Sequence, residues 1–377
     1  MNQRFYRTIS KVLGIAAIAT MGFMSPAQAQ SWPDKPIKLV IPFAAGGTTD
    51  IIGRILAQQM APILGQNVVV ENRGGAGGNI GAEAVARAPA DGYTLLLASG
   101  SMLTVNPHMY KKMSINYAKD FAPISTLVSG PMIISVNPKL AVNNLNDLIA
   151  LAKTKNLNFG SAGIGSQVHL AGENFITAAG INATHIPYKG EAAALSDLIA
   201  GQIDFCACNV PASTGFIKSG QIKALAVTSA KRLAALPNIP TVAEASIPGF
   251  ENVGWFALMA PSNTPKVITD KIYAAAIKAV KSEAMQKSLE LNSLTPVLNT
   301  QKELEAQIAS ESIKWEKVIK ARNLTANWLH TLQYSVLTEQ QSINYLLVPS
   351  LEFLGWVFFI TIFFKLPPRL FRQGAPY

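Results

Sequence analysis

Residues 37–64 read IKLVIPFAAGGTTDIIGRILAQQMAPIL and contain a strand, a glycine-rich loop and a helix in succession. The β-branched run at 37–41 predicts the strand. Apolar residues at helical spacing predict the helix over 50–64. Repeated β-loop-α units pack around a mostly parallel sheet, so this stretch predicts an α/β protein.

The same alternation continues along the chain in two series that meet near residue 131. Two segments, 122–129 and 254–260, look like crossings between the series, and a chain that leaves a lobe and returns forms a two-stranded hinge. The sequence therefore predicts two α/β lobes that close around a ligand. We name them lobe 1, residues 30–125 plus 256–327, and lobe 2, residues 126–255.

The loop of the first unit has the composition of an anion site. Gly46 and Gly47 permit positive φ and let main chain approach a ligand, and Thr48 or Thr49 can cap the helix. Free N–H groups of the first turn, together with the helix dipole, bind anions without a basic side chain. An ordinary glycine turn with a threonine cap is the alternative interpretation.

Lobe 2 repeats this device. The strand predicted at 157–159 leads into a glycine-rich turn with Ser161 and Gly163, and a helix starts near Ser166 and carries His169. Ligands of open α/β sheets bind at the carboxyl ends of the strands, where both turns are expected. If the two turns face each other, each can hold one carboxylate of a diacid.

Three other loops occupy equivalent strand ends. They offer the polar side chains Asn79, Ser99, Thr104, Tyr188 and Lys189. Lys189 is the best-placed cation for a distal carboxylate, and a solvated loop lysine is the alternative. We expect these five residues to contribute to the ligand site.

The spacing of the candidate residues does not match the common catalytic or nucleotide-binding motifs. The chain contains no G-x-G-x-x-G at 74–81, no Walker-type loop, no H-E-x-x-H and no G-x-S-x-G elbow. His169 and Glu173 are four residues apart, but two metal ligands without a third are weak support for a metal site. The sequence predicts a binding protein with no catalytic residues, metal or cofactor.

The N-terminus predicts export. Arg4, Arg7 and Lys11 precede an apolar stretch at 12–24, and an A-x-A site ends at Ala29. A retained anchor is the alternative, but this stretch is shorter than the roughly 20 residues that a bilayer requires. We expect residues 1–29 to be a signal peptide cleaved near Ala29, so that the mature chain is exported.

The charge and the cysteines exclude further classes. A formal net charge of +10 favours acidic solutes, and no run of Lys and Arg interleaved with aromatics predicts nucleic-acid binding. Cys206 and Cys208 lie on one face of a predicted buried strand, which favours two small core residues. A disulfide between them would need strained geometry.

Several motifs in order resemble the Bug-type receptors of tripartite tricarboxylate transporters. They are WPDKPI at 32–37, PFAAGGTTD at 42–50, ENRGGAGG at 71–78, PADGYT at 89–94 and IPYKG at 186–190. The resemblance covers about residues 32 to 323. It implies a type II periplasmic binding protein that closes like a Venus flytrap on a small carboxylate, either a di- or tricarboxylate, an acidic amino acid or an aromatic acid.

The resemblance also implies partners and site residues. The receptor would hand its carboxylate to membrane permease subunits; a ligand-sensing module of the same fold is the alternative. By position, the first-strand loop of the family matches Ala45, Gly46, Gly47, Thr48 and Asp50. The second-lobe contact matches Ser161, Gly163 and Ser166, and Tyr188 and Lys189 fall before the next helix.

The segment 328–377 departs from the family, whose members usually end soon after the preceding helix. The stretch at about 345–364 is apolar and long enough to span a bilayer, and basic residues follow it. Basic residues there would place the C-terminus in the cytoplasm. Pro349 and Glu352 interrupt the stretch, so an inner-membrane anchor and a frameshifted or fused terminus both remain open.

Overall fold

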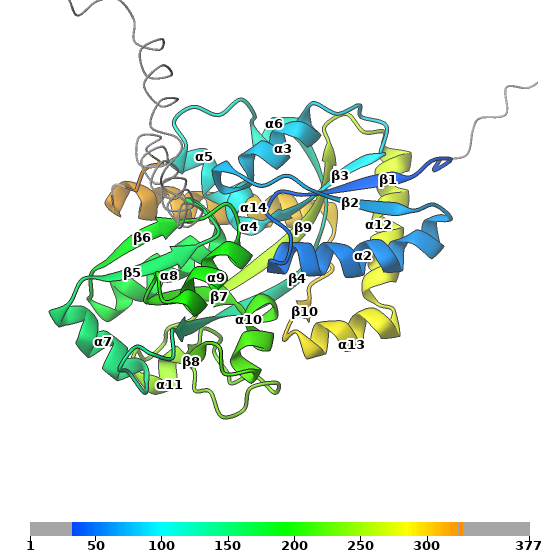
Figure 1. Ribbon diagram of the computed structural model, residues 1–377. Coiled ribbons are helices and arrows are strands. Elements are labelled where there is room, and N and C mark those ends of the chain that lie inside the picture. Colours follow the sequence, from blue (N-terminus) through cyan, green and yellow to red (C-terminus); the bar gives the residue numbers. More distant parts are fainter. Residues whose placement is uncertain (1–31, 323, 327–377) are drawn as a thin grey trace, which may run out of the picture. The chain divides into compact units, whose positions relative to one another are not determined.

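The computed structural model describes residues 32–322 and 324–326, in which the strands form one sheet (Figure 1). The strand order is β2-β1-β3-β9-β4-β7-β5-β6, and β8 and β10 also pair with β4. The strands are β1 (Ile37–Ile41), β2 (Val68–Asn72), β3 (Thr94–Ser99), β4 (Phe121–Val136), β5 (Leu157–Ser161), β6 (Ala183–Pro187), β7 (Phe205–Asn209), β8 (Lys223–Val227), β9 (Val253–Pro261) and β10 (Thr295–Pro296).

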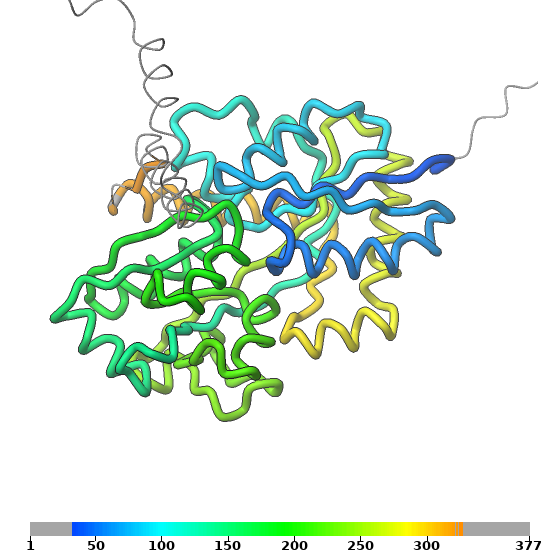
Figure 2. The backbone as a smooth tube through the Cα atoms, in the orientation of Figure 1, coloured from blue at the N-terminus to red at the C-terminus, as the bar shows by residue number. Residues whose placement is uncertain are grey.

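Strand β4 runs through both lobes. Its first part pairs antiparallel with β9, from Phe121 opposite Pro261 to Pro131 opposite Val253. Its second part pairs antiparallel with β7 and β8. The two predicted crossing segments are therefore neighbouring strands, and Figure 2 shows the backbone passing between the lobes along them.

Helices cover the sheet and begin close to the predicted positions. The helix expected over 50–64 starts two residues earlier, because Thr48 and Thr49 already have helical geometry. The helical elements are α2 (Thr48–Leu64), η1 (Ala76–Gly78), α3 (Asn79–Ala86), α4 (Gly100–Thr104), α5 (Asn106–Met109), α6 (Tyr117–Asp120), α7 (Leu145–Thr154), α8 (Gln167–Ala179), α9 (Glu191–Ala200), α10 (Val210–Lys218), α11 (Val242–Ala245), α12 (Lys266–Val280), α13 (Glu283–Leu291) and α14 (Gln301–Arg322).

The apolar core is divided among clusters, and the one that matters for function crosses the lobes. Phe43 and Met102 of lobe 1 belong to the same buried cluster as Val168 and Leu195 of lobe 2. Apolar surface buried between lobes favours their association by about 25 cal/mol per Å². The structure is thus a closed arrangement of the two lobes.

Strand β7 carries both cysteines with fully buried side chains. Their sulfur atoms are joined, across a Cα–Cα distance of 5.4 Å, which corrects the interpretation of Cys206 and Cys208 as two unbonded core residues. Side chains two residues apart on a strand share one face, and this brings the two sulfurs together.

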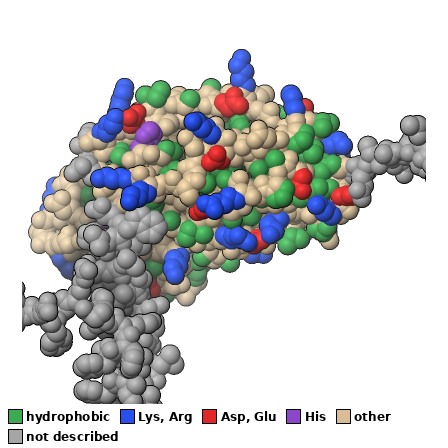
Figure 3. All heavy atoms as spheres, turned by 90° about the horizontal axis from the view of Figure 1, so that it is seen from above, with side chains coloured by type: hydrophobic (Ala, Val, Ile, Leu, Met, Phe, Trp, Pro, Cys, Tyr) green, Lys and Arg blue, Asp and Glu red, His purple; other side chains and the backbone are tan. Residues whose placement is uncertain are grey.

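The predicted signal peptide at 1–29 and the predicted membrane segment at about 345–364 lie outside the described residues. Among the helices of the described part, none combines the length and apolar character that crossing a bilayer requires. On the described surface, Figure 3 shows Lys and Arg side chains spread over one face with Asp and Glu between them, so the positive charge there is dispersed.

Candidate ligand site between the lobes

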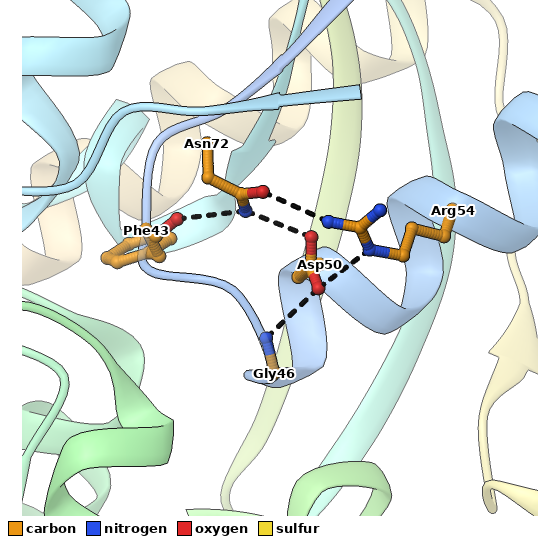
Figure 4. Close-up of polar contacts among 5 residues, drawn as sticks. All are labelled: Phe43, Gly46, Asp50, Arg54 and Asn72. Carbon is orange, nitrogen blue, oxygen red and sulfur yellow. Dashed lines mark hydrogen bonds and ion pairs between the residues drawn. The ribbon is translucent and has the colours of Figure 1, made fainter. Parts of the chain in front are cut away.

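The loop between β1 and α2 is held in shape by Asp50. Its carboxylate accepts hydrogen bonds from Gly46 N (3.0 Å), Arg54 Nε (2.9 Å) and Asn72 Nδ2 (2.9 Å) (Figure 4). Asn72 also donates to the Phe43 carbonyl at 3.2 Å. Gly46 adopts a φ of 84°, in the left-handed region that favours glycine. The first turn of α2 is therefore presented by a rigid loop.

The same contacts set the ionisation of Asp50. Burial acts to raise the pKa of its carboxyl, but the hydrogen bonds from Arg54, Gly46 and Asn72 outweigh burial and lower the pKa below its ordinary value. Asp50 consequently has a structural role, because its carboxylate is hydrogen-bonded to Gly46 of the loop, Arg54 of α2 and Asn72 of β2.

We expect Asp50→Ala to destabilise the protein by about 1–3 kcal/mol, because it removes the acceptor shared by the part-buried hydrogen bonds from Gly46 N and Asn72 Nδ2. Urea unfolding measures this change. Because the folded pKa lies below the unfolded one, the carboxylate's contribution is present above pH 4 and lost as pH falls below about 3.8. Asp270→Ala, which removes an exposed ion pair with Lys266, is the matched control and should change stability by less than about 0.5 kcal/mol. Equal effects would contradict the role of Asp50.

A carboxylate of lobe 2 occupies the first turn of α2. Glu191 Oε2 accepts a hydrogen bond from Thr48 N at 3.0 Å. Its Oε1 accepts from Asn209 N (2.5 Å) and Asn209 Nδ2 (2.9 Å). The Thr48 hydroxyl in turn accepts from Ala212 N of α10 at 3.3 Å. The main-chain donor predicted to hold a ligand's carboxylate thus holds a protein carboxylate in this closed form.

These contacts surround a small cavity between the lobes. Four predicted residues line it, namely Gly47, Thr48, Ser99 and Ser166. The other seven lining residues were not predicted site residues, namely Phe43, Thr49, Ala162, Gln167, Val168, Glu191 and Asn209. The cavity volume of about 20 Å³ is enough for roughly one water molecule. A ligand can enter only if the lobes move apart.

Side chains of Ser161 and His169 hydrogen-bond to the backbone of the glycine-rich turn of lobe 2 and hold it in place. Ser166 Oγ caps α8 by accepting from His169 N at 3.2 Å. His169 Nδ1 accepts from Gly165 N at 3.3 Å, and Ser161 Oγ accepts from Gly163 N at 3.1 Å. Ser161 and His169 therefore support the turn from beneath, whereas Ser166 reaches the cavity.

The buried His169 and the partly buried His185 stack behind this turn. The ring centroids of His169 and His185 are 4.0 Å apart, and Phe159 packs on His185 at 4.8 Å. Burial lowers the pKa of His169 to about 4 and the pKa of His185 well below its ordinary value, with His169 adding to the latter shift. Both rings are neutral at pH 7, and His169 carries its proton on Nε2 because Nδ1 is an acceptor.

The other predicted site residues lie elsewhere in the closed form. Asn79 Oδ1 accepts from Asn106 Nδ2 (2.9 Å) and Tyr117 OH (2.8 Å). Tyr188 OH donates to Asp197 Oδ2 at 2.6 Å, and Lys189 is exposed. Ala45 and Gly46 are exposed at the rim of the loop, and Thr104 lines a separate cavity beside Trp255. Their contact with a ligand stays a prediction.

Two α/β lobes joined through neighbouring long strands, with helix N-termini and a cavity between them, define the class of periplasmic solute-binding proteins. The chain belongs to the tripartite tricarboxylate transporter receptor family, whose model matches residues 52–324. The predicted fold class and family are confirmed.

Individual relatives agree with this assignment. The chain is 38% identical to protein BugT of Bordetella pertussis, over 82% of this chain and 95% of BugT. The solved structure of periplasmic binding protein BugD superposes with a TM-score of 0.75 at 36% identity, covering 78% of this chain and all of that one. A structure of R. palustris Rpa4515 with adipate gives 0.75 at 35% identity, covering 78% and 99%.

Proposed function

We propose that this protein is an extracytoplasmic receptor that captures a small carboxylate between its lobes and delivers it to the permease subunits of a tripartite tricarboxylate transporter. The observation that carries the proposal is the carboxylate of Glu191 on Thr48 N, because it occupies the position that a ligand's carboxylate would take. The first turn of α2 binds an anion without a basic side chain, as helix N-termini do. The adipate bound by the R. palustris neighbour supports the ligand class.

Capture would proceed by opening and closing about β4 and β9. Lobe 1, residues 30–125 plus 256–327, and lobe 2, residues 126–255, would move as separate bodies. The long antiparallel pairing of these two strands provides the connection. Hinge motions of this kind concentrate the change in a few residues and leave each lobe's packing intact. A ligand that contacts both lobes would stabilise the closed form.

The location of the receptor follows from its N-terminus and its family. We propose that residues 1–29 direct export and are removed after Ala29, so that the receptor acts in the periplasm. For the segment 328–377 the apolar stretch at 345–364 supports an inner-membrane anchor. Membrane fractionation of the full chain and of a chain ending at residue 327 tests the anchor, and a soluble full-length product would exclude it.

A thermal-shift panel tests the receptor function. A carboxylate at 100 times its Kd should stabilise the folded state by about 2.7 kcal/mol, which is measured as a rise in Tm. The panel contains di- and tricarboxylates, acidic amino acids and aromatic acids, and 1,6-hexanediol is a neutral control for adipate. Unchanged Tm with every acid would rule the proposal out.

A further inference from the structure

The interlobe cavity contains a buried carboxyl group with no cation beside it among the described residues. Glu191 is 4% exposed, and among the described residues its carboxylate makes no ion pair. None of the residues lining the cavity is Lys, Arg or His. Buried charges in proteins are normally paired, because an isolated carboxylate loses its hydration without compensation. An ionised Glu191 would therefore be stabilised by a cation that the described residues do not supply.

Asn209 keeps the carboxylate at the cavity whether the lobes are open or closed. Both Asn209 donors lie in lobe 2, as Glu191 does, whereas Thr48 N lies in lobe 1. When the lobes separate, the Thr48 donor becomes free and Glu191 loses its hydrogen bonds from Thr48. A ligand that enters between the lobes would meet a main-chain donor on one side and a carboxylate oxygen on the other.

The side chain of Gln167 also lines this cavity, while its Oε1 lies beside Gly254, which lines a separate cavity. Gln167 is 8% exposed, and its Nε2 donates to Asn209 Oδ1 at 3.0 Å. Its Oε1 has no hydrogen-bond partner among the described residues. Buried polar atoms without a partner are rare in native proteins. An ammonium group carries three donors, so it could pair with Glu191 and keep two donors for other acceptors.

We propose that Glu191 makes this receptor selective for an amino-carboxylate, whose carboxylate binds at Thr48 N and whose ammonium pairs with Glu191. The inference rests on the proposed function and narrows its ligand class. A second carboxylate at this place would face Glu191 with like charge, at a buried site where repulsion is weakly screened. Burial also raises the pKa of Glu191, against the opposing hydrogen bonds from Thr48 and Asn209, and a ligand cation would favour its ionised form.

The test compares ligands that differ only at one end. Adipate, its monoamide and 6-aminohexanoate share one carboxylate and a chain of six carbon atoms. The other end of the chain carries a carboxylate, a neutral amide or an ammonium group, respectively. The four- and five-carbon series cover shorter spacings. Titration calorimetry at pH 7 measures each against wild type, Glu191→Gln and the control Glu251→Gln, an exposed glutamate outside the cavity.

We expect wild type and the control to bind the amino-carboxylate at least tenfold more tightly than the dicarboxylate of equal length. In Glu191→Gln this preference should disappear or reverse. The same ranking in Glu191→Gln as in wild type, or a wild-type preference for the dicarboxylate, would overturn the inference and leave the carboxylate receptor standing. Failure of every probe on all three proteins would overturn the inference, and the thermal-shift panel then decides separately whether the carboxylate receptor stands.

A second variant guards against misfolding. Glu191→Asp keeps the charge and shortens the side chain by one methylene, so it should retain the preference for the amino-carboxylate with weaker binding. If Glu191→Gln does not fold, loss of the preference in a folded Glu191→Asp would overturn the inference. Retention of the preference would support it.

Discussion

Gly46→Val is expected to weaken carboxylate binding by about 100-fold while the protein still folds. Gly46 has a φ of 84°, which costs a side-chain-bearing residue about 1–2 kcal/mol. A Cβ added there would lie 3.5 Å from Ala192 Cβ of lobe 2, so the branched methyls of valine would meet α9 as the lobes close. Calorimetric titration with a carboxylate from the thermal-shift panel measures the loss.

Gly65→Val separates binding from strain. Gly65 ends the same helix with a φ of 69°, and a Cβ there would meet nothing within 4 Å. Both variants therefore carry the cost of a branched residue at positive φ, but only Gly46→Val obstructs the closed site. Equal affinities in the two variants would remove the β1–α2 loop from the ligand site.

Acidification is expected to destabilise the protein by about 3 kcal/mol through His169. Its pKa is about 4 in the folded protein and 6.5 in the unfolded chain, and each pKa unit is worth 1.36 kcal/mol. Because the folded pKa is the lower one, the contribution is complete above pH 6.5 and is lost as pH falls towards 4. Urea unfolding at several pH values measures the loss.

The difference in pH-dependent stability between wild type and His169→Phe isolates the contribution of His169. Glu173 lies 3.6 Å from His169 Nε2, and burial raises its pKa, which opposes the histidine's effect in part of the same range. His185 titrates beside it and contributes with the same sign as His169. Phenylalanine can keep the ring stack and cannot titrate. Between pH 6.5 and 4 the free energy of unfolding of the variant should therefore fall by about 3 kcal/mol less than that of wild type. Parallel profiles would refute the assignment.

Local signals predicted much of the fold. Strand β1, the loop after it and helix α2 are encoded within 28 consecutive residues, and the structure moves only the start of the helix. The same holds for α8, which begins at Gln167, next to the predicted start near Ser166. Hydrophobic periodicity, glycine turns and caps act over a few residues, so a sequence pattern is sufficient to find them.

The site was less predictable because its contacts join distant parts of the chain. Thr48 and Glu191 are separated by 143 residues and meet only when the lobes close. From sequence, Glu191 is an ordinary acidic residue in the first turn of a helix, where such residues are common. Lys189 was the more conspicuous candidate, yet its side chain is exposed. Which of two neighbouring charged residues faces the cavity depends on the orientation of α9 against α2.

Strand β4 links the stability of the two lobes. It is one uninterrupted strand of 16 residues, with its first part hydrogen-bonded to β9 and its second part to β7 and β8. Unfolding either lobe would remove part of β4, the strand that both lobes share. Backbone donors and acceptors in the other lobe would then be left unpaired. Local unfolding of one lobe should therefore propagate into its neighbour, so that the chain unfolds as a single cooperative unit.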